Sequence, residues 1–161
     1  TYYSCFQWRY RSLKLSLQNG ADIDYQDGSG QTALMRAAEG GHLEICGLLI
    51  DTGCKIDITV NGWTALMFAA MKGHLEICRR LIDRGCKIDT TTGNGGTALM
   101  LAVRGGHLEI CRLLIDRGCK IDITNIRGYT ALHYAAQGGH LLITRCLVER
   151  GGANPLVTTH E

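Results

Sequence analysis

The sequence contains no apolar run that approaches the roughly 20 residues a membrane-spanning helix requires. The stretch from Tyr2 to Arg11 mixes aromatic and polar residues and so lacks the apolar core of a signal peptide. The chain also has no large excess of either charge, because 17 basic and 15 acidic side chains leave a net charge of +2. Proteins that bind by neutralising phosphates need a larger basic excess. These absences argue against a membrane protein, an exported protein and a nucleic-acid-binding protein.

Motifs of common catalytic chemistry are missing as well. The chain has no GxxxxGK[ST] phosphate loop, no GxSxG nucleophile turn and no HExxH pair. Three aspartates recur at equivalent positions, at Asp51, Asp83 and Asp116. They recur beside Arg84 or Arg117, which is typical of a solvated ion-pair surface rather than of a catalytic dyad. We therefore expect no enzymatic activity, no cofactor and no small-molecule substrate.

The main feature that the sequence does contain is an internal repeat. A Gly-Xaa-Thr-Ala-Leu segment begins at Gly30, Gly62, Gly95 and Gly128, so successive copies are 32, 33 and 33 residues apart. A GGHLEIC-like segment follows each copy in the same phase, and an IDRGCKID-like segment closes each unit. A fixed period of this length is typical of solenoids, in which stacked units share one continuous core.

Each unit contains signals for two short helices. In the first unit, Thr32 is placed as the N-cap of a helix that Gly41 ends. A second helix carries an apolar stripe and ends at Gly53, which can adopt the left-handed conformation of a C-cap. An alternating Ile-Asp-Ile segment and a Gly-rich turn then form an extended connector that reverses direction. The apolar face of one such unit is too small to be stable alone.

These blocks resemble the ankyrin repeat, which is marked by a threonine-led TPLH segment, paired alanines, a Gly-His step and a closing Gly-Ala. The resemblance covers residues 20 to 155. It implies an all-α ankyrin-repeat solenoid of stacked helix-turn-helix units with β-hairpin-like turns. On this basis we divide the chain into a partial leading repeat or cap, four full repeats and a tail, at residues 1–26, 27–58, 59–91, 92–124, 125–157 and 158–161.

The departures from the family pattern are regular. Alanine replaces the TPLH proline in every unit, which is well tolerated in a first helical turn. The histidine of that segment survives only as His133, and methionine stands in the other units, so we expect the first three units to be slightly looser. An end repeat must turn a polar side to water, but the last unit carries Leu142, Cys146 and Leu147, so we expect its outer side not to be polar. We therefore expect the natural array to continue past Glu161.

Histidine and cysteine recur four residues apart on the second helix, as in the pair His42 and Cys46. Two such ligands could begin a zinc site, but units in a stack lie about 8 to 10 Å apart, so the pairs cannot converge on one ion. The resemblance implies instead that the histidine bonds the backbone of a neighbouring unit. We expect no metal site.

The chain contains eight cysteines, most of them at repeating positions. One set falls on the buried stripe of the second helices, and another replaces the small alanine that the family has after its closing glycine; the two sets are Cys46, Cys78 and Cys111, and Cys54, Cys86 and Cys119. Equivalent cysteines are one unit apart, beyond the roughly 7 Å Cα separation of a disulfide. Buried free thiols suit a reducing compartment, so we expect the protein in the cytoplasm or nucleus.

Partners of ankyrin-repeat proteins dock in a groove formed by the turn tips and the exposed side of the first helices. The matching positions here differ between units, whereas scaffold positions such as Thr32 hardly change. The resemblance therefore assigns partner binding to Gln31, Arg36, Glu39, Val60, Asn61, Trp63, Phe68, Met71, Lys72, Asn94, Leu101, Arg104, Ile126, Arg127, Tyr129, Tyr134 and Gln137.

The aromatic residues of this set have two interpretations. Phe68 and Tyr134 lie on helices, where they contact either a partner or neighbouring helices. Trp63 and Tyr129 lie in turns, where we expect no core for them to join, so we favour partner contact. We predict a monomeric, non-catalytic protein-interaction module. The alternatives are a spacer or clamp within a longer chain and, less compatible with the charge of +2, a single-stranded RNA binder.

Overall fold

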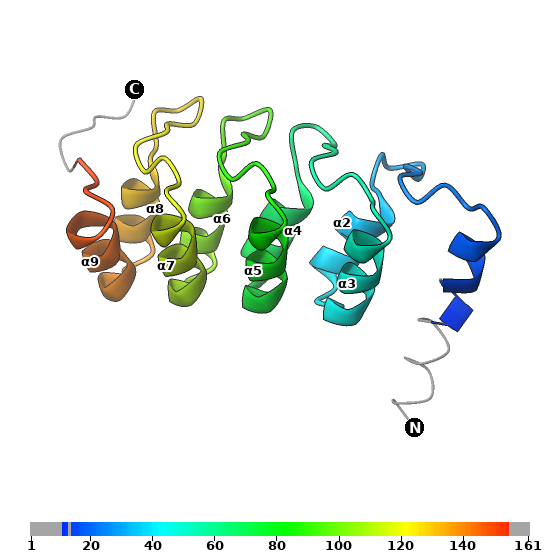
Figure 1. The fold of residues 1–161 in the computed structure, drawn as a ribbon. Helices are drawn as coiled ribbons and strands as arrows, with labels where there is room; N and C mark the ends of the chain where they lie inside the picture. The colour runs from blue at the N-terminus through cyan, green and yellow to red at the C-terminus, as the bar shows by residue number, and fades with distance from the viewer. Residues whose placement is uncertain (1–10, 13, 155–161) are drawn as a thin grey trace.

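The computed structural model describes residues 11–12 and 14–154. After a helical segment that includes residues 14–18, the described chain forms helix pairs. They are α2 (Ala33–Glu39) with α3 (Leu43–Asp51), α4 (Ala65–Lys72) with α5 (Leu75–Asp83), α6 (Ala98–Arg104) with α7 (Leu108–Asp116), and α8 (Ala131–Gln137) with α9 (Leu141–Glu149). The pairs stand side by side in chain order, and their connecting loops project at one end of the stack (Figure 1). This arrangement confirms the predicted all-α solenoid.

The first helix of every unit begins after a buried threonine. The hydroxyls of Thr32, Thr64 and Thr97 accept hydrogen bonds from the backbone N–H three residues later, at 3.2 to 3.3 Å. The predicted N-cap is therefore confirmed. In the fourth unit, His133 Nδ1 accepts from the backbone N–H of Thr130 at 3.1 Å. Methionine side chains occupy that position in the other units and are buried, so apolar packing stands there in place of the hydrogen bond.

The core runs through the stack between two layers of helices. The layer of α2, α4, α6 and α8 makes more extensive contacts between units than the layer of α3, α5, α7 and α9. Paired small residues explain this difference, because Ala37, Ala38, Ala69 and Ala70 are almost completely buried and allow close approach of the first helices. We call the turn tips together with the exposed side of these first helices the inner face, and the exposed side of the second helices the outer face.

The histidines of the Gly-His step join neighbouring units. His74 Nε2 donates to the carbonyl oxygen of Glu39 at 3.1 Å, and His107 Nε2 donates to that of Met71 at 3.1 Å. Gly41 is required at this junction, because it has a φ of 75° and a Cβ there would lie 2.6 Å from His74 Cε1. The structural role that the family resemblance implied for these histidines is confirmed.

Two further sets of contacts join the units. Backbone N–H groups of Lys55, Lys87 and Lys120 each donate to an aspartate of the preceding unit, at 2.8 to 2.9 Å. Near the ends of the second helices, Arg117 pairs with Asp83 of the preceding unit at 2.6 Å, and equivalent pairs join Arg84 to Asp51 and Arg150 to Asp116. The predicted ion-pair surface is thus present, and its pairs connect adjacent repeats. Such exposed pairs contribute about 0 to 1 kcal/mol each.

The outer side of the last unit differs from the sequence interpretation. Cys146 and Leu147 are both buried, and Leu147 belongs to the core, so their assignment to the outer side was wrong. The exposed apolar side chains of α9 are Leu141, Leu142 and Val148.

Candidate partner-binding surface

The structure places most of the predicted partner-binding residues at accessible positions. Exposed residues are Arg36, Asn61, Lys72, Asn94, Arg104, Ile126, Arg127 and Gln137. Half-buried residues are Gln31, Glu39, Val60, Trp63, Met71, Tyr129 and Tyr134. Phe68 and Leu101 are only 8% and 6% exposed, because both side chains join the core. For Phe68 this is the helix-packing alternative, whereas the expected exposure of Leu101 on its first helix was wrong.

Trp63 also differs from its sequence interpretation. It pairs with Val60 through two backbone hydrogen bonds of 2.9 and 3.0 Å, and its ring centroid lies 5.1 Å from that of Phe68. Trp63 therefore packs against the edge of the core while remaining half-exposed. The expectation that a turn aromatic has no core to join was wrong, because the turn folds back over its own first helix.

The second turn is one residue shorter than the others, which accounts for the 32-residue interval in the sequence. Its two central residues, Asn61 and Gly62, have φ angles of 52° and 80°, as in a type I′ hairpin turn. Backbone hydrogen bonds of 3.1 Å link the tips, from Gly93 N–H to Asn61 O and from Ile126 N–H to Asn94 O. The tips of the last three units therefore form one connected surface.

The first turn is closed by a charged residue. Asp27 Oδ1 accepts from the backbone N–H groups of Ser29 and Gln31, at 2.9 and 3.1 Å. Its other oxygen accepts from Arg36 Nε and Nη2, at 3.1 and 2.9 Å. The hydroxyl of Ser29, and then Arg36, hold the pKa of this carboxyl well below its usual range. Asp27 is therefore ionised at neutral pH, and both of its carboxylate oxygens accept hydrogen bonds.

We call a group of neighbouring residues from the third and fourth units the tyrosine cluster; its members are Arg104, Asn125, Arg127, Tyr129 and Tyr134. Asn125 Oδ1 accepts from the backbone N–H groups of Arg127 and Tyr129, at 2.9 and 3.0 Å. Its amide nitrogen donates to the hydroxyl of Tyr134 at 2.8 Å. The Tyr129 and Tyr134 rings lie 5.7 Å apart, and the Arg104 guanidinium carbon lies 5.5 Å from the Tyr134 centroid. Asn125 was not among the residues predicted from the sequence, although asparagine at the start of a turn is a known signal.

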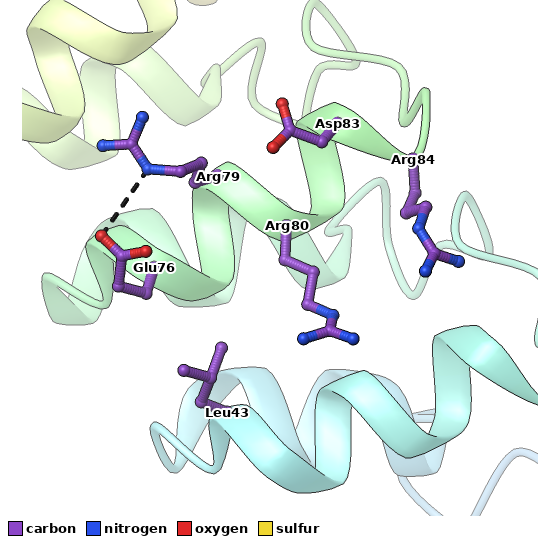
Figure 2. Close-up of a pocket in the computed structure, with 6 residues that line it drawn as sticks. All are labelled: Leu43, Glu76, Arg79, Arg80, Asp83 and Arg84. Carbon is purple, nitrogen blue, oxygen red and sulfur yellow. Dashed lines mark ion pairs between the residues drawn. The ribbon is translucent and has the colours of Figure 1, made fainter.

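A shallow groove of about 280 Å³ lies on the outer face between α3 and α5. Its lining residues are Leu43, Glu76, Arg79, Arg80, Asp83 and Arg84 (Figure 2). Arg79 pairs with Glu76 at 3.6 Å, and Arg80 with Asp51 at 3.1 Å. None of the predicted partner-binding residues lines this groove, and its arginines already serve ion pairs.

The seven cysteines of the described residues carry free thiols. Cys46, Cys78 and Cys111 are buried as predicted, whereas Cys5 lies outside the described residues. Burial raises the pKa of each of these three thiols to about 12, so they are protonated and unreactive at neutral pH.

Residues 11–12 and 14–154 contain neither a metal-binding cluster nor a membrane-spanning helix. Within these ranges, no group of three or more His, Cys, Asp or Glu side chains is arranged to hold a metal ion. Nor does any helix there have the length and apolar content needed to cross a membrane.

Taken together, stacked helix pairs, Thr N-caps and histidine links define a helical-repeat solenoid with an accessible inner face. A family model described as "Ankyrin repeats (3 copies)" matches residues 3–92 and 84–159. The chain belongs to the ankyrin-repeat family, a non-enzymatic family whose repeats are generally protein-protein interaction modules.

One curated relative is the Drosophila melanogaster protein named "Ankyrin repeat and KH domain-containing protein mask". The two chains are 35% identical over 54 residues, which is 34% of this chain and 1% of the Drosophila protein. This chain therefore aligns with only a small part of that relative.

Proposed function

We propose that this chain is a non-catalytic protein-interaction module whose partner binds the inner face. The observation that carries the proposal is the contrast between repeated scaffold positions and varied surface positions. The residue just before each capping threonine is Gln31, Trp63, Gly96 or Tyr129, whereas the threonine itself never changes. Variation on a connected, accessible surface supports contact with a specific partner.

The outer face supports this role less well. Its arginines pair with carboxylates of the same helix or of the preceding unit, and those pairs connect the repeats. The free, mostly buried thiols support action in a reducing compartment such as the cytoplasm or nucleus.

Affinity capture from a cell extract tests the proposal. The wild type is compared with Trp63→Ala on the inner face and with Leu142→Ala, whose side chain is 60% exposed on α9. Because Trp63 packs on Phe68, melting curves must first define a temperature at which each variant stays folded. We expect proteins that the wild type and Leu142→Ala capture equally and that Trp63→Ala captures about tenfold less. Equal capture by all three, or loss on Leu142→Ala alone, would contradict an inner-face interface.

A spacer or clamp role within a longer protein is the alternative. The Drosophila relative supports it, because its name combines ankyrin repeats with a KH domain and the aligned segment is 1% of its length. Binding of this array to a separately produced domain of its own natural chain would favour the clamp.

A further inference from the structure

Acidic residues are absent from the inner face of the last three units. Residues 59–74, 90–107 and 123–140, which include the turn tips and the first helices, contain no aspartate or glutamate. The same segments carry Lys72, Arg104 and Arg127, all exposed. The acidic residues of these units lie instead on the second helices and the connectors. The aspartates there join neighbouring repeats, and the glutamates pair with arginines of their own helix.

Two arginines stand apart from the rest. Most arginines between residues 14 and 154 pair with a carboxylate, namely Arg36, Arg79, Arg80, Arg84, Arg112, Arg117, Arg145 and Arg150. Within that range, only Arg104 and Arg127 have no carboxylate partner. Both belong to the tyrosine cluster, and the Arg104 guanidinium is held over the Tyr134 ring. The two unpaired arginines therefore belong to the first helix of the third unit and the turn of the fourth, on the inner face.

The hydroxyl of Tyr134 is oriented to complement an anion. Because Asn125 Oδ1 accepts from two backbone N–H groups, its amide nitrogen must point to Tyr134. The Tyr134 oxygen therefore acts as the acceptor in that hydrogen bond, which leaves its own proton for another acceptor. A carboxylate at this place would accept from Tyr134 and lie beside the Arg104 guanidinium, with the exposed Arg127 in the adjoining turn. Hydrogen bonds between charged groups of this kind are strong.

We propose that the tyrosine cluster binds a carboxylate-bearing, extended segment of a partner protein. This inference rests on the proposed function and adds the chemistry of the partner. An acidic peptide fits better than RNA for two reasons. Three exposed cations are few beside the roughly six to ten phosphate contacts typical of nucleic-acid binding. In addition, the tyrosine rings pack against one another, which leaves less ring face for base stacking.

Selection from a random dodecapeptide display library, with the intact chain immobilised, tests this inference. We expect the enriched peptides to carry an excess of aspartate and glutamate. The strongest peptide is then synthesised with a fluorescent label, together with a copy in which every Asp and Glu is replaced by its amide. Anisotropy titration at about 0.15 M salt should show about tenfold weaker binding of the amide copy.

Two charge-matched variants place the site. The double variant Arg104→Gln with Arg127→Gln should bind the acidic peptide about tenfold or more weakly than the wild type. The control, Arg79→Gln with Arg145→Gln, removes the same charge from the outer face and should change affinity less than about twofold. Melting curves verify that both variants are folded.

Three results would overturn the inference. The first is selection of no peptides or of peptides without acidic excess, and the second is equal loss of binding in both double variants. The third is a single-stranded oligouridylate that binds more tightly than the peptide and competes with it. If one of these results appears while Trp63→Ala still loses a captured protein, the proposed function stands and only the acidic chemistry of the partner fails.

Discussion

The first and fourth units close equivalent turns with different side chains. Asp27 and Asn125 each lie five residues before the capping threonine, and each accepts from two backbone N–H groups of its turn. Each also contacts the residue four positions after that threonine, which is Arg36 in the first unit and Tyr134 in the fourth. One contact is an ion pair and the other a neutral hydrogen bond.

This difference has consequences for the surface. In the first unit, the carboxylate of Asp27 neutralises the charge of Arg36. The neutral pair of the fourth unit closes an equivalent turn without a carboxylate, so Arg104 and Arg127 remain uncompensated. A single difference, aspartate against asparagine, separates a self-contained turn from one that can attract an anion.

The largest effect on stability is expected at the position three residues after the capping threonine, where the first and fourth units differ. Met35→Ala removes a buried side chain of the first unit and should lower the free energy of unfolding by about 2–5 kcal/mol. His133→Ala at the equivalent position of the fourth unit removes a hydrogen bond to Thr130 and should cost about 1 kcal/mol. Urea denaturation measures both. Equal costs would mean that the hydrogen bond stabilises its unit as much as the apolar packing does.

Removal of the asparagine should have a smaller effect. Asn125→Ala leaves the N–H groups of Arg127 and Tyr129 without their acceptor and should cost about 1–2 kcal/mol. Asn125→Asp keeps that acceptor and should stay within about 0.5 kcal/mol of the wild type. Thermal unfolding measures the stability of both variants. A large loss of stability in Asn125→Asp would show that the Tyr134 contact, rather than the turn, needs the amide.

The charged turn should also respond to acid. The folded-state pKa of Asp27 is held below its usual value of 3.8, so its stabilising effect is complete above that pH. The effect is lost as the pH falls from about 4 through the folded pKa. Wild type should therefore lose stability relative to Asp27→Asn in this acidic window, while the difference between them stays constant near neutral pH. A difference that does not change with pH would contradict the ion pair's role.

The smallest effect is expected on the outer face. Arg150→Gln removes the exposed pair with Asp116 and should change the free energy of unfolding by less than about 1 kcal/mol, with a still smaller change at high salt. Denaturation at low and high salt measures it. A larger loss would show that the outer ion pairs contribute as much as the inner helix layer.

Local signals in the sequence predicted the repeat, the threonine caps and the free, buried cysteine positions, because each depends on a few neighbouring residues. Contacts between units were harder to predict. The bond from Lys55 N–H to Asp24 depends on how one connector lies against the next, which no local pattern specifies. The burial of Trp63 likewise depends on a shortened turn that folds over Phe68. The pairing of Asn125 with Tyr134 requires both the turn and the helix to be in place.

The most direct test of the account is the affinity of the selected acidic peptide for wild type and for Asn125→Asp. The substitution gives the fourth turn the carboxylate of the first and places it next to Tyr134 and Arg127. We predict about tenfold weaker peptide binding with an unchanged melting temperature. Unchanged affinity would contradict the claim that an uncompensated basic surface at the fourth unit recognises the partner.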